Sequence, residues 1–127
     1  METYGRLVCH IGVLVREATS DGAPVRIGGI GGVMTHPDAR RVRHAAAGIG
    51  RAMSFLRDDQ RCDFGLLVCD DDLISYYEGL RWRTFSGALL TLQRGETVPF
   101  TFNRVMVMDL VENAPERGTI DLLGPPW

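Results

Sequence analysis

The stretch that decides the fold lies between residues 31 and 45 and reads GGVMTHPDARRVRHA. Its first part is apolar and typical of a strand. Arginines at positions 40, 41 and 43 follow Pro37 and Asp38, which mark a helix start. Backbone N–H groups in the first turn of a helix have no partner within the helix, and the helix dipole is positive there. The stretch therefore predicts a strand–turn–helix unit with a site for phosphate or another anion.

The hydrophobic pattern around this stretch predicts one α/β (α+β) domain with a mixed central sheet. We expect strands over residues 6–16, 25–35, 63–69, 82–94 and 98–110, with a short edge strand within residues 118–124. Turn residues between 19 and 24 make the first two strands an antiparallel hairpin. Apolar residues recur at helical spacing from residue 38 to residue 58, so strands 25–35 and 63–69 become parallel neighbours through a helical crossover.

The carboxyl ends of these two parallel strands are the expected ligand site. Parallel strands that diverge leave a cleft at the switch point, where α/β folds bind ligands, and the arginine turn is expected at its mouth. Asp70, Asp71 and Asp72 follow the second parallel strand. We expect them to cap a short helix that ends near Gly79.

Length and composition narrow the functional classes. A chain of 127 residues forms one core, and 14 basic against 16 acidic residues give a net charge of -2, which disfavours general nucleic-acid binding. Cys9, Cys62 and Cys69 lack the spacing of a zinc site or a disulfide framework, so no metal is expected. The apolar run from Leu7 to Val15 is interrupted by His10, which indicates a strand and not a membrane span. We expect a soluble, cytoplasmic protein.

Four glycines lie within the second expected strand, at positions 28, 29, 31 and 32. Glycine inside a strand marks a bulge or a place where a backbone or ligand comes close. The glycines therefore allow either the approach of a ligand or the tight packing of neighbouring side chains. They do not form a dinucleotide fingerprint, because no third glycine stands at Met34 and no helix opens directly after them.

Residues 40–45 resemble motif A of the GNAT superfamily of acyl-CoA-dependent N-acetyltransferases, whose pattern is Arg/Gln-x-x-Gly-x-Gly/Ala. Arg40 matches the leading basic residue and Ala45 the last position, while Arg43 replaces the first glycine. The Arg43 side chain either blocks a pyrophosphate or binds it with planar, bidentate donors, and we favour binding. Three arginines at a helix start also fit a solvated face without a ligand.

A second segment, ISYYEGLRW at residues 74–82, resembles motif B of the same superfamily, in which a tyrosine ends a helix and a glycine begins the next strand. On that match Tyr77 is the general acid that protonates the departing thiolate. A tyrosine packed in the core, with no chemical role, is the alternative. Arg81 replaces the glycine of the motif, which puts the geometry of this turn in question.

The resemblance implies a GNAT-like sheet with a splayed parallel strand pair and flanking helices, and acetyl-CoA as co-substrate. It assigns coenzyme A binding to the end of the second strand and to the arginine turn, that is, to Val33, Met34, Thr35, Arg40, Arg41, Val42, Arg43, His44 and Ala45. The acetyl group would pass directly to a primary amine of a small molecule. Motif A and the ending GTIDLLGPPW are most similar to the branch of aminoglycoside 2'-N-acetyltransferases and nodulation-factor acyltransferases.

The proton of the acceptor amine has no single expected base. Asp70, Asp71, Asp72 and Glu78 are the nearest acidic residues along the chain, and the superfamily often moves this proton through water. A Cys69 nucleophile is disfavoured, because no histidine stands near it in the sequence and direct transfer does not need one.

The GNAT domain usually begins with a strand and one or two helices that wall the acceptor site, whereas here the resemblance begins near His10. Two hypotheses follow. The protein is an active acetyltransferase, or it is a non-catalytic acyl-CoA-binding or oligomerisation module. We also expect a homodimer, because one face of the sheet would lack cover. The side chains expected at the contact are Phe85, Leu90, Leu92, Phe100, Phe102, Met106 and Met108.

Overall fold

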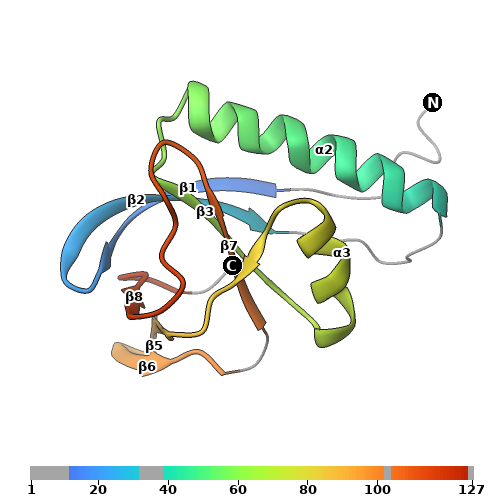
Figure 1. Ribbon diagram of the computed structural model, residues 1–127. Helices are drawn as coiled ribbons and strands as arrows, with labels where there is room; N and C mark the ends of the chain where they lie inside the picture. Colours follow the sequence, from blue (N-terminus) through green and yellow to red (C-terminus); the bar gives the residue numbers. More distant parts are fainter. Residues whose placement is uncertain (1–11, 32–38, 102–103, 126–127) are drawn as a thin grey trace.

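The computed structural model describes residues 12–31, 39–101 and 104–125, with the backbone alone over residues 39–46. The described part is a mixed α/β fold in which one curled eight-stranded sheet carries two helices (Figure 1). Its elements are, in chain order, β1 (Gly12–Ser20), β2 (Ala23–Gly31), α2 (Ala39–Asp58), β3 (Phe64–Cys69), the 3-10 turn η1 (Asp71–Leu73), α3 (Ile74–Gly79), β4 (Arg83–Thr84), β5 (Ala88–Gln93), β6 (Glu96–Pro99), β7 (Arg104–Asp109) and β8 (Thr119–Asp121).

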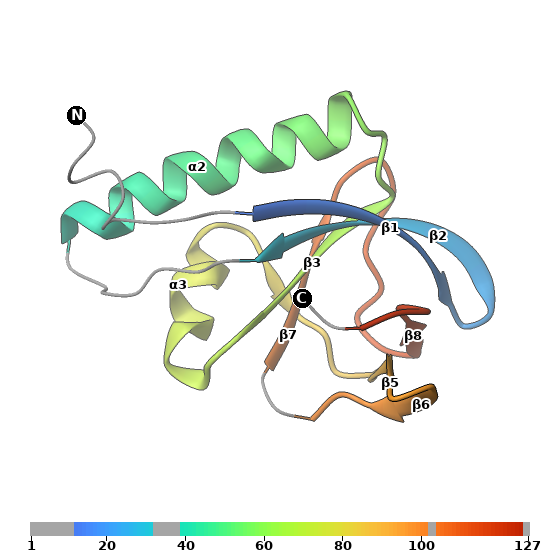
Figure 2. The ribbon, with the colours of Figure 1, turned by 180° about the vertical axis from the view of Figure 1, so that it is seen from behind.

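The strands follow the order β4-β7-β3-β2-β1-β8-β5-β6 across the sheet. β2 and β3 are parallel neighbours, with Ile27 opposite Phe64 and Gly29 opposite Leu66, which confirms the pairing predicted from the sequence. β4 and β5 follow one another in the chain but lie near opposite ends of this order. The sheet therefore curls back on itself (Figure 2).

The first hairpin forms with its turn where it was predicted, although β1 ends later than expected. Asp21 and Gly22 make its two-residue turn with positive φ angles of 49° and 84°, the conformation that matches the twist of paired strands. β1 continues to Ser20 and does not end at Arg16, because its last residues also pair with β8 through Thr19 and Ser20. The predicted start of this strand, residues 6–11, lies outside the described residues.

The two long strands predicted over residues 82–94 and 98–110 are each divided, so this prediction is wrong in detail. β4 pairs with β7, and β5 pairs with β6, while residues 85–87 form a bend between them. Gly87 lies directly against the backbone of Gly118, and β5 pairs with β8 beyond this point. The bend at residues 85–87 therefore connects β4, at one end of the strand order, to the β5–β6 hairpin at the other end.

The three aspartates after β3 do not cap a helix, contrary to expectation. Asp70 stands at the N-cap of η1, but its side chain makes no capping hydrogen bond, and α3 begins after Leu73 without one. Asp71 instead accepts a hydrogen bond from Arg104 at the start of β7, with 2.6 Å between Nε and Oδ1. Because this ion pair is exposed, it holds η1 beside β7 only weakly.

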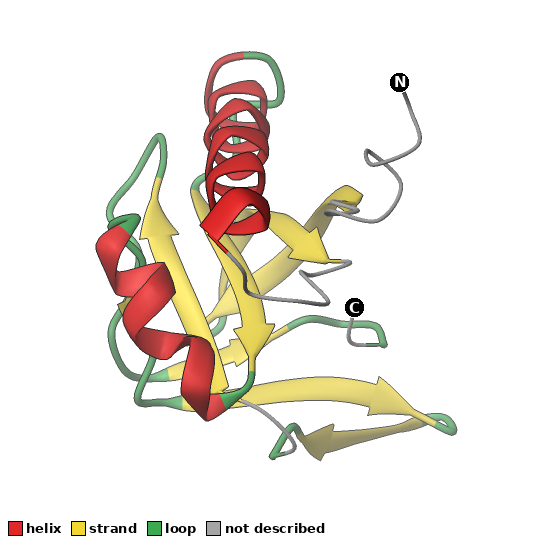
Figure 3. Ribbon diagram, turned by 90° about the vertical axis from the view of Figure 1, so that its right-hand side faces the viewer, coloured by secondary structure: helices red, strands yellow, loops and turns green. Residues whose placement is uncertain are grey.

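The sheet has one apolar core on each face. The inner core lies inside the curl and is made of Ala18, Ile27, Phe64, Leu66, Phe85, Leu89, Val105, Val107, Ala114, Ile120 and Leu122. The helix-side core lies between the sheet and both helices and is made of Ile30, Ile49, Met53, Leu56, Cys62, Leu67, Cys69, Tyr77, Trp82 and Met106. Figure 3 shows α2 and α3 on the outside of the curled sheet. Alternate residues of β3 face the two cores, as the period of a strand requires.

Gly28 of β2 lets α2 approach the sheet closely. A Cβ atom built on Gly28 would lie 2.7 Å from Cδ1 of Leu56, a fully buried side chain of α2. At this position the tight-packing interpretation of the strand glycines is therefore the one that the structure supports. No helix in the described ranges is long and apolar enough to cross a membrane.

Candidate functional site

The two central parallel strands lose their mutual pairing toward their carboxyl ends. Their register ends with Gly29 opposite Leu66, although β2 continues to Gly31 and β3 to Cys69. Over these last residues β2 remains paired with β1, and β3 remains paired with β7. At its carboxyl end, each of the two strands thus stays paired only with its outer neighbour in the sheet. Ligands of α/β folds bind at switch points where neighbouring strands separate in this way.

The helix that follows β2 is α2, which begins at Ala39 after residues 32–38. Of the expected coenzyme A residues, Arg40, Arg41, Val42, Arg43, His44 and Ala45 lie in the first two turns of α2, where the structure describes the backbone alone. Val33, Met34 and Thr35 lie outside the described residues. The first turn of α2 contains no acidic side chain that would neutralise the positive end of the helix dipole.

Tyr77 is buried in the helix-side core, with 3% of its surface exposed. Its ring makes edge contacts with Tyr76 and Trp82, at centroid distances of 5.1 and 6.3 Å. Burial raises the pKa of the Tyr77 phenol to about 12, and repulsion from the ionised forms of Cys69 and Tyr76 adds to the rise. The phenol therefore keeps its proton at neutral pH, as a proton donor must.

Cys69 is the last residue of β3 and belongs to the same core as Tyr77. Burial raises the pKa of its thiol to about 11, with further contributions from Asp70, Asp71 and Asp72. A protonated thiol is a poor nucleophile. This environment agrees with the prediction that Cys69 does not attack the acyl group.

The turn after α3 has the backbone that the glycine of motif B would favour. Arg81 occupies this position with a φ of +75°, in the left-handed region. Its N–H donates to the Glu78 carbonyl, and the Trp82 N–H donates to the Tyr77 carbonyl, both at 3.0 Å. These two hydrogen bonds form a Schellman motif, which ends the helix and directs Trp82 into the core. Arg81 therefore adopts a backbone conformation that glycine adopts readily.

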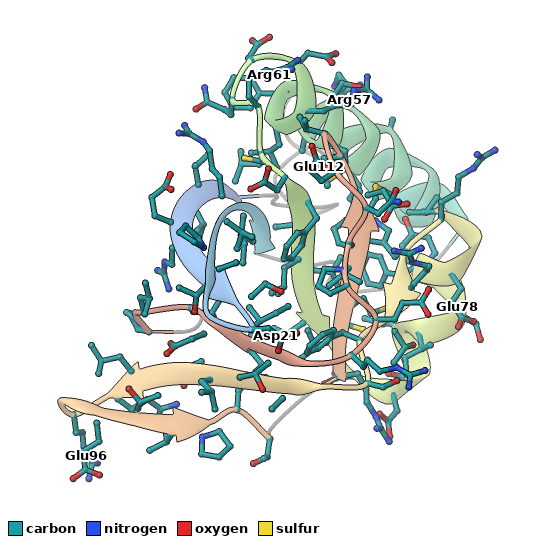
Figure 4. The ribbon with its side chains drawn as sticks, turned by 60° about the vertical axis from the view of Figure 1, so that its left-hand side comes forward. Asp21, Arg57, Arg61, Glu78, Glu96 and Glu112 are labelled. Atoms are coloured by element: carbon teal, nitrogen blue, oxygen red, sulfur yellow. The ribbon has the colours of Figure 1, made fainter. Side chains whose placement is uncertain are left out.

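The acidic residues near the site do not identify a base. Asp70, Asp72 and Glu78 are exposed, and Asp71 is paired with Arg104. Glu78 lies on α3 and points away from the body of the molecule (Figure 4). Among the described residues, no group of three or more His, Cys, Asp or Glu side chains is placed to hold a metal ion.

Two features of the structure escaped the sequence analysis. The indole Nε1 of Trp82 is buried and has no hydrogen-bond partner among the described residues. An open cleft of about 370 Å³ also lies at the amino ends of β2 and β3, lined by Ser20, Pro24, Val25, Asp63, Phe64, Glu112, Asn113 and Pro115. The cleft lies at the opposite ends of β2 and β3 from the expected ligand site. It forms where the loop after β7 returns to β3, so no short sequence motif predicted it.

No protein family fits this sequence, and no curated protein is similar enough to count as a relative.

Proposed function

We propose that this protein is an acetyl-CoA-dependent N-acetyltransferase that acts on a primary amine of a small molecule. The observation that carries the proposal is the loss of pairing between β2 and β3 after Gly29 and Leu66, with η1 and α3 following directly after β3. Anions bind at helix starts, and ligands of α/β folds bind at such switch points. A GNAT-like arrangement has the same parallel pair, followed by an arginine-rich helix start.

In this proposal the start of α2 holds the pyrophosphate of coenzyme A. Unpaired backbone N–H groups and the positive end of the helix dipole attract the anion, and Arg40, Arg41 and Arg43 add charged donors. The pantetheine arm then extends along the edge of β2 that no longer pairs with β3 beyond Gly29. The thioester would then lie toward α3, which carries Tyr77.

Tyr77 acts as the general acid. The amine attacks the thioester carbon directly, the nitrogen gives up a proton to water, the C–S bond breaks, and the phenol transfers its proton to the departing sulfur. At a pKa of about 12, the phenol is in the protonated form that this step requires. The turn at Arg81 supports this assignment, because it reproduces the backbone expected after the motif tyrosine.

The burial of Tyr77 favours a second candidate, a non-catalytic acyl-CoA-binding module. With only 3% of its surface exposed and two aromatic edge contacts, Tyr77 also fits a purely structural role. The two candidates share the phosphate site but differ in turnover.

The homodimer remains part of the proposal, and light scattering across a concentration series tests it. Two of the side chains expected at the dimer contact, Phe85 and Met106, are buried within the protomer, so the contact would be smaller than expected.

The decisive experiment measures coenzyme A binding and acetyl transfer separately. Calorimetry with coenzyme A should give salt-sensitive binding, and the Arg40→Ala/Arg43→Ala double variant should bind it more weakly by about 1.5–3 kcal/mol or more. Arg51→Ala, an exposed arginine farther along α2, is the matched control. Unchanged affinity in the double variant would refute the phosphate site.

Thiol release from acetyl-CoA, measured across aminoglycosides, polyamines and amino-acid amides, then separates enzyme from module. Release that depends on one class of amine supports the acetyltransferase. Binding of coenzyme A without release by any amine supports the module.

A further inference from the structure

The open cleft at the amino ends of β2 and β3 marks one end of the inner core. Val25 packs against this core and Phe64 belongs to it, and both residues also line the cleft. Pro24 and Pro115 add further apolar surface. The polar lining residues are Ser20, Asp63, Glu112 and Asn113. The cleft therefore has the composition of a small-molecule site, in which apolar surface is combined with a few polar groups.

Hydrogen bonds hold the loop that forms one wall of the cleft. The Glu112 N–H donates to the Asp63 carbonyl at 2.9 Å, which fixes the loop beside the start of β3. Two residues later, the buried Ala114 donates its N–H to Oδ1 of Asp109 at 2.7 Å. Asn113 lies between these two anchor points. The wall is thus formed before any ligand binds, so binding does not have to order it.

Asp63 presents a carboxylate that is held in place but not neutralised. Its Oδ2 accepts a hydrogen bond from the Arg26 N–H at 2.8 Å, whereas Oδ1 has no hydrogen-bond partner in the described part of the chain. The Arg26 guanidinium instead donates to Glu17 and Gln60. Successive side chains of a strand point to opposite faces, so the Arg26 side chain lies on the other face of β2 from Val25. The cleft therefore keeps the negative charge of Asp63.

The charges of the cleft select for a cation. Glu112 contributes a second carboxylate, which is exposed to solvent. Among the described residues, no Arg or His side chain lines the cleft. A ligand with a positive charge and an apolar body matches this lining, because its ammonium group satisfies the free acceptor of Asp63 and its body covers Val25 and Phe64. A ligand that carries a carboxylate or a phosphate would be repelled.

We propose that the cleft binds a small organic cation, an ammonium group attached to an apolar body. Asp63 and Glu112 bind the ammonium group, and Val25 and Phe64 contact the body. The site is separate from the proposed coenzyme A site, because it lies at the opposite ends of β2 and β3. The inference therefore does not depend on the proposed function.

The test compares phenethylamine, which is protonated at neutral pH, with phenethyl alcohol, its uncharged isostere. Titration of the full chain, followed through its amide NMR signals, measures both affinities and locates the site. Phenethylamine should shift the signals of Phe64, Asn113 and their neighbours, and it should bind about tenfold more tightly than the alcohol. The Arg40→Ala/Arg43→Ala double variant should bind phenethylamine as tightly as the parent protein.

Three variants test the carboxylates. Asp63→Asn keeps an oxygen acceptor for the Arg26 N–H and removes the charge, so it should weaken phenethylamine binding about tenfold and affect the alcohol little. Glu112→Gln should weaken it only about twofold, because Glu112 is exposed. Glu78→Gln is the matched control, since Glu78 is an exposed carboxylate that points away from the body of the molecule (Figure 4), and it should leave binding unchanged.

Four outcomes would overturn the inference. Equal affinities for the amine and the alcohol would show that the carboxylates do not select a cation. Equal losses in Asp63→Asn and Glu78→Gln would show attraction by overall charge in place of a site. Signals that shift in α3 and not in the cleft would assign phenethylamine to the acceptor site of the proposed acetyltransferase. Absence of binding at millimolar concentrations would remove the site and leave the proposed function unaffected.

Discussion

The inner core and the helix-side core differ in the kinds of side chain that they bury. The inner core is built from strands and loops, and its buried members are all aliphatic or phenylalanine. The helix-side core buries the thiols of Cys62 and Cys69, the phenol of Tyr77 and the indole N–H of Trp82. Burying polar groups is costly unless they are paired. Of the two cores, only the helix-side core therefore offers polar groups that the proposed acetyltransferase could use.

The substitution Tyr77→Phe tests this division most directly. It keeps the ring and removes the proton, so acetyl transfer should slow by roughly ten- to ten-thousand-fold with little change in coenzyme A affinity. Because the pKa of Tyr77 is raised to about 12, no loss of activity from its titration is expected below about pH 11. Steady-state kinetics measure both effects. Tyr76→Phe, the adjacent residue on α3, is the control and should retain the parent rate; an equally active Tyr77→Phe would make Tyr77 a packing residue.

Leu66 and Leu67 sharpen the comparison, because they are adjacent in β3 and face opposite cores. Both side chains are almost completely buried. Leu66→Ala and Leu67→Ala should therefore each lower the free energy of unfolding by about 2–5 kcal/mol. Only Leu67→Ala removes a neighbour of the Tyr77 cluster, so only this variant should also weaken acetyl-CoA binding. Urea unfolding and calorimetry measure the two quantities. Equal loss of binding in both variants would show that the two cores are not functionally distinct.

Much of the fold was predictable because its signals are local. A continuous apolar run at residues 63–69 after a helical crossover predicted the parallel pair β2 and β3, and helical spacing predicted α2. The division of the long hairpin was not predictable, since it depends on Gly87 meeting Gly118 about thirty residues later in the chain. The prediction that Asp71 caps a helix was wrong for a similar reason. Its actual partner, Arg104, is distant in the sequence.

The candidate site was predictable to a smaller extent. The motifs located Tyr77 and the start of α2, but nothing in the sequence indicated that Tyr77 would be buried against Trp82. The sequence left the geometry of the turn at Arg81 open, and Arg81 has the positive φ that glycine adopts readily. Local sequence identifies which residue types are present, whereas burial and backbone strain depend on the surrounding tertiary structure.

The buried thiol of Cys69 predicts a smaller, pH-dependent effect. Its folded pKa of about 11 exceeds the ordinary value of 9.0, so the folded state holds a proton that the unfolded state releases. The resulting stability is present below pH 9 and is lost as the pH rises from about 9 to 11, by up to about 1.4 kcal/mol per pH unit. Denaturant unfolding at pH 8, 9, 10 and 11 measures it. Cys69→Ala should lessen the loss over this range, and identical slopes for both proteins would show that Cys69 ionises normally in the fold.

The smallest expected effect concerns the turn that directs Trp82 into the helix-side core. Arg81 has a φ of +75°, which costs free energy for a residue with a Cβ atom and costs glycine little. Arg81→Gly should therefore raise the free energy of unfolding by about 0.5–1 kcal/mol, while leaving the Schellman hydrogen bonds intact. Leu80→Gly is the matched control, because Leu80 has a φ of −97° and gains no relief from glycine. It should destabilise the protein. If Arg81→Gly destabilises the fold as much as Leu80→Gly does, the Arg81 side chain contributes more by its packing than its backbone conformation costs.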